Sequence, residues 1–189
     1  MSKDDRRHAL VQAAFNEIAE RGFEGLRTRE VAAEVGVNIA TLHYYFPTKE
    51  ALIRGVVELS MQMFRSTLVP HGSSAEQLRN HLRAVRRLLR DEPRLGAVMA
   101  ELGLRSARDP ALASIMEETN GAWYRVVRGL IRNAARDGHL RPDLDSDDVA
   151  AIVVATLASM TLPAVAGTNR ADQVLRQLER WLGWPQATD

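Results

Sequence analysis

The residues whose chemistry stands out lie between Gly36 and Lys49, where no side chain is acidic. Hydrogen-bond donors are frequent in this run: Asn38, Thr41, His43, Tyr44, Tyr45, Thr48 and Lys49. Amide, hydroxyl, imidazole and ammonium groups of this kind contact the phosphates and base edges of nucleic acids. Because phosphates would repel carboxylates, the absence of acids favours a surface that approaches DNA. A helical hairpin with an ordinary polar face is the alternative.

Two short helices and a turn are predicted to position these donors. The first helix begins near Thr28, a candidate N-cap, and carries apolar residues at helical spacing: Val31, Ala32 and Val35. Gly36 stands where a helix commonly ends in a left-handed residue. Asn38 offers the N-cap of a second helix, which Pro47 terminates, and Thr48 caps a longer third one. Two short helices joined by a turn of about three residues are typical of a helix-turn-helix, whose second helix can enter a DNA major groove.

The order of residues is more specific than this pattern. Two stretches carry it: Val31-Ala32 to Gly36-Val37, and Thr41-Leu42-His43-Tyr44-Tyr45-Phe46-Pro47-Thr48-Lys49-Glu50-Ala51-Leu52. Together they closely resemble the DNA-binding domain of the tetracycline-repressor (TetR) family of bacterial transcriptional regulators. The resemblance is strong over residues 8–55 and architectural beyond them. It implies a homodimer that binds a near-palindromic operator in double-stranded DNA and responds to a small molecule.

Roles in DNA binding follow from position and from the resemblance. Thr28 and Arg29 suit a phosphate, because free N–H groups and the helix dipole favour an anion at a helix N-terminus, and Lys49 adds a full charge. The residues expected to face base edges are Asn38, Ile39, Ala40, Thr41 and His43. The resemblance implies a phosphate contact for Tyr45, and Tyr44 and Thr48 complete the predicted DNA-binding set. Ile39 and Ala40 are apolar, so contact with a thymine methyl group or readout of DNA shape is expected to contribute.

Composition is that of a globular chain without thiol chemistry. The 189 residues are 46% hydrophobic and include no cysteine, which rules out disulfides, thiolate metal sites and cysteine nucleophiles. No apolar run reaches the ~18 residues of a membrane span, and the first residues lack the apolar segment of a secretory signal. A cytoplasmic protein without membrane association is therefore expected. The net charge of +1 is too small to indicate nucleic-acid binding by itself.

The chain shows neither an alternating strand pattern nor an internal repeat, so an all-α fold is expected. It consists of a three-helix head over residues 1–48, with the helix-turn-helix, and a larger C-terminal bundle over 49–189, about nine helices in all. The first helix should run from a cap at Ser2 to about Arg21, ended by Gly22. The core of the head should contain Phe23, Leu26, Val31, Leu42 and Phe46. Bundle helices are expected at about 49–68, 75–90, 93–106, 110–137, 146–165 and 171–183.

An arginine-rich run in the bundle is interpreted as a solvated helix face. The arginines are Arg79, Arg83, Arg86, Arg87, Arg90 and Arg94. The buried stripe of the same helix is occupied by Leu78, Leu82, Val85 and Leu89, which leaves the arginines outside. A second surface for DNA or RNA is the alternative.

Four aspartates, Asp143, Asp145, Asp147 and Asp148, resemble the start of a calcium-binding loop. The match fails further on, because Asp148 stands where the loop needs glycine and Val154 where it needs a bidentate glutamate. Capping of the next helix is the simpler interpretation.

A small-molecule pocket is expected in the bundle, chiefly because the resemblance implies one among the helices at about 49–68, 93–106 and 110–137. Methionine and aromatic side chains adapt to varied ligand shapes, and a few polar groups give orientation. The candidate lining is Met61, Phe64, Met99, Leu102, Met116, Thr119, Asn120 and Trp123. An ordinary core whose polar groups point to solvent is the alternative.

The last two helices carry two wide apolar stripes. The resemblance implies that they pair with their mates in a four-helix dimer interface, and packing on the body is the alternative. The candidate interface residues are Ile152, Val153, Leu157, Met160, Leu175, Leu178, Trp181 and Leu182. A two-fold dimer suits two recognition helices that enter successive major grooves.

The predicted function is therefore a ligand-responsive DNA-binding homodimer that acts as a repressor, with activation as the alternative sign. The five histidines show no H-E-x-x-H spacing, and neither a Gly-rich phosphate loop nor a G-x-S-x-G elbow is present. No catalysis, cofactor or metal is expected. From other classes, the alternatives are a small all-α ligand-binding protein or enzyme that uses the bundle cavity, and a protein-interaction module.

Overall fold

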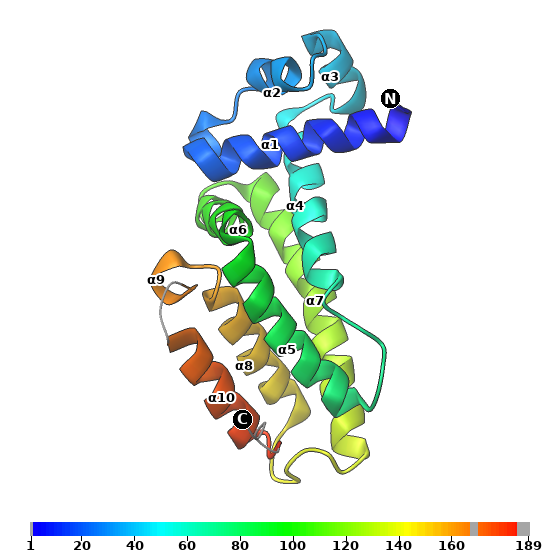
Figure 1. Cartoon of the computed structure of the whole chain (residues 1–189), viewed down its shortest axis with the longest axis vertical. Helices are drawn as coiled ribbons and strands as arrows, with labels where there is room; N and C mark the ends of the chain where they lie inside the picture. Colours follow the sequence, from blue (N-terminus) through cyan, green and yellow to red (C-terminus); the bar gives the residue numbers. More distant parts are fainter. Residues whose placement is uncertain (1, 167–169, 185–189) are drawn as a thin grey trace. The chain divides into compact units, whose positions relative to one another are not determined.

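A computed structural model of the chain describes residues 2–166 and 170–184. All regular elements in these residues are helical, which confirms the predicted all-α fold (Figure 1). They are α1 (Lys3–Gly25), α2 (Thr28–Glu34), α3 (Ile39–Tyr45), α4 (Lys49–Arg65), α5 (Ser74–Asp91), α6 (Pro93–Ser106), α7 (Pro110–Arg136), α8 (Ser146–Ser159), α9 (Pro163–Ala166) and α10 (Arg170–Trp181). Because α9 has only 4 residues, nine longer helices remain in the described part of the chain. None of the helices in that part combines the length and the apolarity that crossing a membrane requires.

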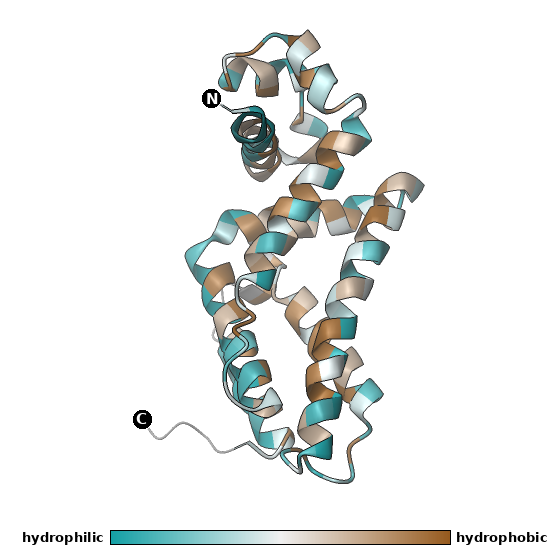
Figure 2. Cartoon of the chain, turned by 90° about the vertical axis from the view of Figure 1, so that its right-hand side faces the viewer, coloured by the Kyte–Doolittle hydropathy of each residue, from teal (hydrophilic) through white to brown (hydrophobic). Residues whose placement is uncertain are grey.

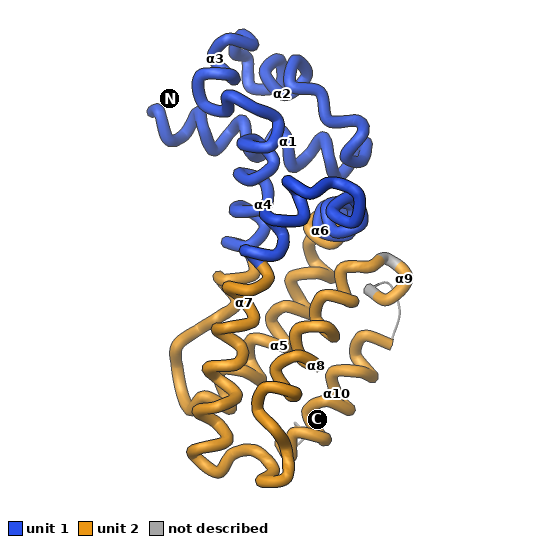
Figure 3. Tube along the Cα trace, turned by 180° about the vertical axis from the view of Figure 1, so that it is seen from behind, with its two compact units in different colours: residues 1–63, 97–119 blue, residues 64–96, 120–189 orange. Residues whose placement is uncertain are grey.

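The chain divides into two compact units (Figure 3). Unit 1 comprises Met1–Met63 and Ala97–Thr119, and unit 2 comprises Phe64–Gly96 and Asn120–Asp189. Helices α4, α6 and α7 each contribute residues to both units.

The first three helices of unit 1 form the head that the sequence predicts. Helix α1 packs against α2, and α2 packs against α3 (Figure 1). The predicted core is confirmed, since its members are all buried: Phe23, Leu26, Val31, Leu42 and Phe46. Burying a side chain of this size contributes about 1.5–3 kcal/mol, so the core fixes how the short α2 and α3 lie on α1.

Side-chain caps define several of the helix starts, but not that of α2. Ser2 forms a reciprocal capping box with Asp5, and Asn38 and Thr48 cap α3 and α4 as predicted. The prediction that Thr28 caps α2 is wrong. The N-cap is Arg27, whose backbone is extended and whose side chain makes no capping bond, so Thr28 is the first helical residue. The helix therefore begins one residue earlier than it would if the hydroxyl of Thr28 were the cap.

Gly22 kinks α1 instead of ending it. Its φ of +72° is in the left-handed region, which glycine adopts without a Cβ penalty, and helical structure then continues to Gly25. The kink turns the N–H of Phe23 away from the helical ladder. This N–H donates to Oε1 of Glu101 in α6 at 3.0 Å, within unit 1.

In unit 2, α5 packs against both α8 and α10 (Figures 1 and 3). The ribbon in Figure 2 alternates between apolar and polar colours along the longer helices, the pattern of amphipathic helices. The predicted apolar stripe of α5 is confirmed as buried: Leu78, Leu82, Val85 and Leu89.

The prediction that all arginines of α5 face solvent is wrong for two of them. Arg83 donates to both carboxylate oxygens of Glu179 at 2.7 and 2.9 Å. Arg86, only 9% exposed, donates to Asp172 at 2.8 and 3.4 Å. Both acids belong to α10, which packs on α5, so these arginines fasten two helices that are distant in sequence.

The segment around α8 begins as predicted and ends early. Asp145 caps α8 by accepting from the N–H groups of Asp147 and Asp148 at 2.8 and 3.0 Å. Arg128 donates to both oxygens of Asp147, and these bonds are the main reason why the pKa of that carboxyl is lowered to about 2. The single helix predicted over about 146–165 is divided into α8 and α9, because the residue before Pro163 disfavours the α conformation.

Candidate nucleic-acid interface

The turn between α2 and α3 is built on Gly36. This residue has a φ of +72°, and its N–H donates to the carbonyl of Ala33 at 3.0 Å. The N–H of Val37 donates to the carbonyl of Ala32 at 2.9 Å, which completes a tight helix end. A Cβ added at Gly36 would meet nothing within 4 Å, so the backbone conformation alone requires glycine here.

At the start of α3, two residues that were predicted to contact bases also form hydrogen bonds that stabilise the helix. Oδ1 of Asn38 accepts from the backbone N–H of Thr41 at 2.8 Å and from its hydroxyl at 2.9 Å. The amide NH₂ of Asn38 and the lone pairs of the Thr41 hydroxyl remain available to a ligand. Both residues therefore hold the recognition helix in shape as well as offering polar groups.

The remaining α3 side chains divide between core and surface. Leu42 and Phe46 are buried, as their i, i+4 spacing predicts. The exposed candidates are Ala40, His43, Tyr44 and Thr48, and the partly exposed ones are Ile39, Thr41, Tyr45 and Lys49. Tyr44 is 68% exposed and meets Tyr45 edge to face, with ring centroids 5.2 Å apart. The Nζ of Lys3 lies 5.4 Å from the Tyr44 ring centroid, so a cation from α1 joins this surface.

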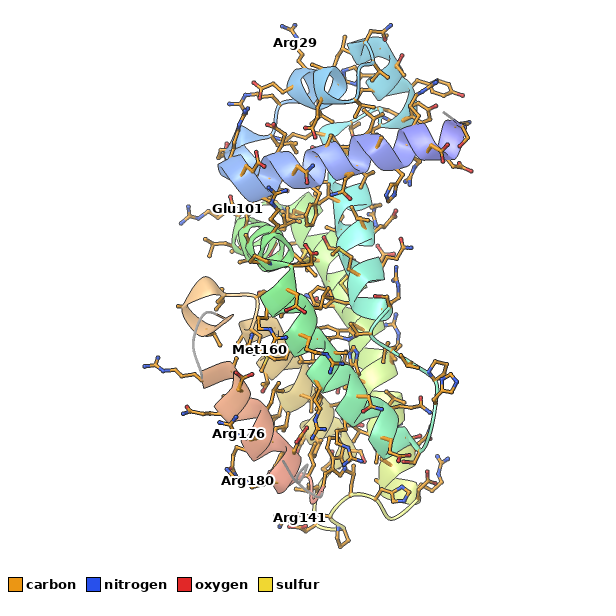
Figure 4. The ribbon with its side chains drawn as sticks, in the orientation of Figure 1. Arg29, Glu101, Arg141, Met160, Arg176 and Arg180 are labelled. Atoms are coloured by element: carbon orange, nitrogen blue, oxygen red, sulfur yellow. The ribbon has the colours of Figure 1, made fainter. Side chains whose placement is uncertain are left out.

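The carboxylates of α2 are engaged by α1. Arg21 donates to Glu30, and Nδ2 of Asn16 donates to Oε1 of Glu34 at 3.4 Å. Arg29 is exposed and projects from α2 away from the ribbon (Figure 4). The guanidinium of Arg29 is therefore free to meet a phosphate, while the charge of the neighbouring Glu30 is partly neutralised by Arg21.

The start of α4 contributes a cation held against an aromatic ring. Thr48 accepts from the N–H of Ala51 at 3.1 Å, so its hydroxyl oxygen serves as a helix cap. The Nζ of Lys49 lies 4.6 Å from the ring centroid of Phe23. This cation–π contact restricts the lysine to one side of the head.

The candidate ligand-pocket residues are distributed over both units. Those in unit 1 are Met61, Met99, Leu102, Met116 and Thr119, and those in unit 2 are Phe64, Asn120 and Trp123. The apolar members are all buried, whereas Asn120 is exposed. The Thr119 hydroxyl donates to the carbonyl of Ile115 at 2.7 Å, within its own helix.

A buried polar relay in unit 2 was missed by the sequence reasoning. The fully buried His81 accepts at Nε2 from the indole N–H of Trp123 at 3.0 Å. Its Nδ1 lies 2.7 Å from the hydroxyl of Thr67, which itself donates to the carbonyl of Phe64 at 2.6 Å. Since that hydroxyl hydrogen is used, Nδ1 must be the donor, which makes His81 a neutral Nδ1–H tautomer. Phe64 stacks on Trp123, with ring centroids 5.7 Å apart.

A signal for this relay was present in the sequence. His81 stands between Leu78, Leu82 and Val85, on the apolar face of α5, where a polar side chain needs partners. Burial lowers the pKa of His81 to about 4, so the imidazole is neutral near pH 7.

Most of the candidate dimer residues are buried within the single chain: Val153, Leu157, Met160, Leu175, Leu178 and Leu182. Ile152 is 45% exposed and Trp181 is partly exposed. Val174, on α10, adds a further apolar side chain that is 42% exposed. Arg176 and Arg180 project from the outer side of the same helix (Figure 4).

Comparison with known proteins agrees with the helix-turn-helix. The family model described as bacterial regulatory proteins of the tetR family matches residues 10–56. A second model, described as the tetracyclin repressor-like C-terminal domain, matches residues 68–178.

Individual relatives belong to the same class of regulators, and a solved structure shares the fold. The transcriptional repressor KstR2 of Mycobacterium tuberculosis is 24% identical over 148 residues, which are 76% of this chain and 74% of that protein. The transcriptional regulator RutR of Escherichia coli K12 is 31% identical over 147 residues, 72% of this chain and 65% of RutR. A crystal structure of a putative TetR-family regulator from Rhodococcus sp. has a TM-score of 0.83 at 21% identity, covering 95% of this chain and 99% of that one. The chain is a member of the tetR family of bacterial transcriptional regulators, whose helix-turn-helix implies DNA binding.

Proposed function

We propose that the protein is a ligand-responsive repressor that binds a near-palindromic operator as a homodimer. The observation that carries the DNA-binding part is the exposed, acid-free surface of α3, with Tyr44 and His43 outward and Leu42 and Phe46 buried. Repression is favoured over activation because the relative KstR2 is described as a repressor.

The proposed DNA contacts are assigned from the polar groups of each side chain that have no hydrogen-bond partner among the described residues. Arg29 and Lys49 meet phosphates, joined by Thr28 and Tyr45, because cations and N–H groups position a protein on the DNA backbone. Base edges are read by Ala40, Thr41, His43 and Tyr44 with apolar contact from Ile39. Asn38 and Thr48 act chiefly as helix caps that keep this surface in shape.

The homodimer is proposed to form through α8 and α10. The side chains that remain exposed there, Ile152, Val174 and Trp181, supply the apolar contact, since most of the other stripe residues already pack inside one chain. A two-fold axis would set two copies of α3 about one DNA turn apart, or a multiple of it, on a palindrome.

The effector is proposed to bind beside the buried aromatic residues of the C-terminal helices in unit 2. The stacked pair of Phe64 and Trp123 supports an aromatic wall in unit 2. A ligand releases the operator only if it binds the DNA-incompetent conformation more tightly, by about 1–3 kcal/mol in typical allosteric couplings.

The test is selection of bound sequences from random duplex DNA at several salt concentrations, with the molar mass recorded in solution. We expect a palindromic site bound by a dimer. Weak, sequence-independent binding that disappears at moderate salt would contradict specific regulation and favour the alternative of a small-molecule-binding protein.

Variants then assign the contacts. His43→Ala should relax sequence preference at one position and cost about 1–3 kcal/mol on the selected site. Arg29→Ala should weaken binding to all sequences and reduce the salt slope by about 1. The matched control is Arg136→Ala, which removes an exposed arginine from α7 and should leave both properties unchanged. Equal behaviour of Arg29→Ala and its control would contradict the phosphate contact.

A further inference from the structure

Unit 2 contains an open pocket of about 620 Å³ that none of the assigned roles uses. It lies where the start of α5, the segment after α7 and the end of α10 meet (Figure 1). The name Trp184 pocket is used here for the space bounded chiefly by Glu76, Arg79, His139, Leu140, Arg141 and Trp184.

Two helix ends of the same kind build this pocket. Helix α7 ends in Gly138 with a φ of +72°, and the N–H of His139 donates back to the carbonyl of Ala134 at 2.8 Å. Helix α10 ends in Gly183 with a φ of +81°, and the N–H of Trp184 donates to the carbonyl of Glu179 at 3.0 Å. In each case the residue after the left-handed glycine lines the pocket, held by a backbone bond that closes its helix.

Arg79 is the cation of the pocket whose guanidinium N–H groups are available to a ligand. Arg141 already donates to both oxygens of Asp143, at 3.0 and 2.6 Å. Glu76, the carboxylate in the lining, accepts from the N–H and hydroxyl of Ser73 at 2.7 and 2.9 Å, so it is the N3 partner in the capping box of α5, whose N-cap is Ser73. The guanidinium of Arg79 lies 6.0 Å from the Trp184 ring centroid and makes no hydrogen bond to a carboxylate in residues 2–166 and 170–184. A planar guanidinium of this kind recognises a carboxylate through two parallel bonds.

The floor of the pocket is apolar and contains an unsatisfied donor. Leu140, Leu182 and Trp184 are buried, and the Trp184 ring is only 5% exposed. Its indole N–H has no hydrogen-bond acceptor in the part of the chain that the structure describes. Buried donors of this kind ordinarily have a partner, so this indole N–H is an unusual group whose surroundings a ligand beside the Trp184 ring would change.

We propose that the Trp184 pocket binds a small aromatic carboxylic acid. The carboxylate pairs with Arg79, assisted by His139, and the ring packs against the accessible edges of Trp184 and Leu140. A cation beside an apolar floor matches an acid that carries a flat apolar body, and it matches neither a bare anion nor a neutral ring. The proposal does not rest on DNA binding, because all of these residues lie in unit 2.

The test uses the full chain labelled with ¹⁵N at its tryptophans. The indole N–H signals of Trp123, Trp181 and Trp184 report three positions in unit 2. The probes are benzoate, acetate, which lacks the ring, and benzamide, which lacks the charge. Benzoate should shift the Trp184 signal saturably and leave the Trp123 signal in place, and acetate and benzamide should bind at least about tenfold more weakly.

Variants of α5 identify the anchor. Arg79→Gln should weaken benzoate binding about tenfold or more, and Arg79→Lys should weaken it less, because the charge remains while the two-pronged geometry is lost. Arg87→Gln, at an exposed arginine of the same helix, is the control and should bind as the unaltered chain does. The proposal is overturned if benzoate leaves the Trp184 signal unmoved, if acetate or benzamide binds as well as benzoate, or if Arg79→Gln retains the affinity. An unchanged thermal midpoint in each variant shows that folding is not the cause.

Discussion

The relay around His81 makes the stability of unit 2 depend on pH. Burial holds the pKa of His81 at about 4 in the folded chain, against an ordinary value of 6.5. The unfolded chain therefore binds more protons than the folded chain between these two values, and stability falls as pH decreases. Protonation would also set an Nε2–H against the indole N–H of Trp123, which now donates to that nitrogen. The contribution of His81 to the free energy of unfolding is therefore complete only above pH 6.5, and it is progressively lost as the pH falls toward 4.

The magnitude follows from the two pKa values. Between pH 8 and pH 5 the linkage of this single group removes about 2 kcal/mol from the free energy of unfolding. For a chain of this length that corresponds to a decrease of about 4–8 °C in the thermal midpoint. Trp123, Trp181 and Trp184 all lie in unit 2, so intrinsic fluorescence follows the unfolding of that unit.

The assay is urea unfolding at pH 8, 7, 6 and 5 for the unaltered chain and for His81→Gln. Glutamine retains a donor and an acceptor but does not titrate, so the difference between the two proteins isolates His81 from other titrating groups. We expect this difference to change by about 2 kcal/mol across the range. A difference that is the same at pH 8 and pH 5 would refute the assignment of a neutral, buried imidazole.

Three further outcomes are expected. Gly36→Ala should destabilise the head by about 1–2 kcal/mol and weaken DNA binding, because the left-handed backbone is strained by a Cβ although the space is open. Its effect is measured by thermal unfolding of the chain, and a neutral result would contradict the strain. Thr67→Val, which leaves Nδ1–H of His81 without its acceptor, should cost about 1–3 kcal/mol in urea unfolding, whereas Thr41→Val at the exposed cap should cost less. Glu179→Gln should lower the free energy of unfolding by about 1–2 kcal/mol, because it removes the charge that pairs with Arg83, whose guanidinium can partly rehydrate. An equal effect of Asp91→Asn, which alters an exposed ion pair, would refute this.

Local patterns predicted the head well because local forces form it. The cap at Asn38, the left-handed Gly36 and the break before Pro47 are each decided by a few neighbouring residues, and the core residues follow from their helical spacing. The failure at Thr28 is also local, since two adjacent positions competed for one cap.

The bundle was less predictable because its partners are distant in sequence. The sequence predicts that Arg83 and Arg86 are solvated, because the acids that they pair with lie on α10, 96 and 86 positions away. The same limit applies to the apolar stripes of α8 and α10. An apolar stripe predicts that this face of the helix is buried. It does not predict whether the face packs against the same chain or against a second copy. The α10 side chains Leu175 and Leu178 are covered by their own chain, whereas Val174 is not.

The kink at Gly22 bears on how the head can be used as a building block. The N–H of Phe23 is satisfied by Glu101, and Arg105 lies 5.1 Å from the Phe23 ring centroid and pairs with Glu24 at 2.6 Å. A fragment cut after the helix-turn-helix would lack these partners and expose the end of α1. Engineers who wish to transplant this DNA-reading surface onto another protein would need to carry the end of α6 with it, because the contiguous sequence of the head is not the complete folding unit.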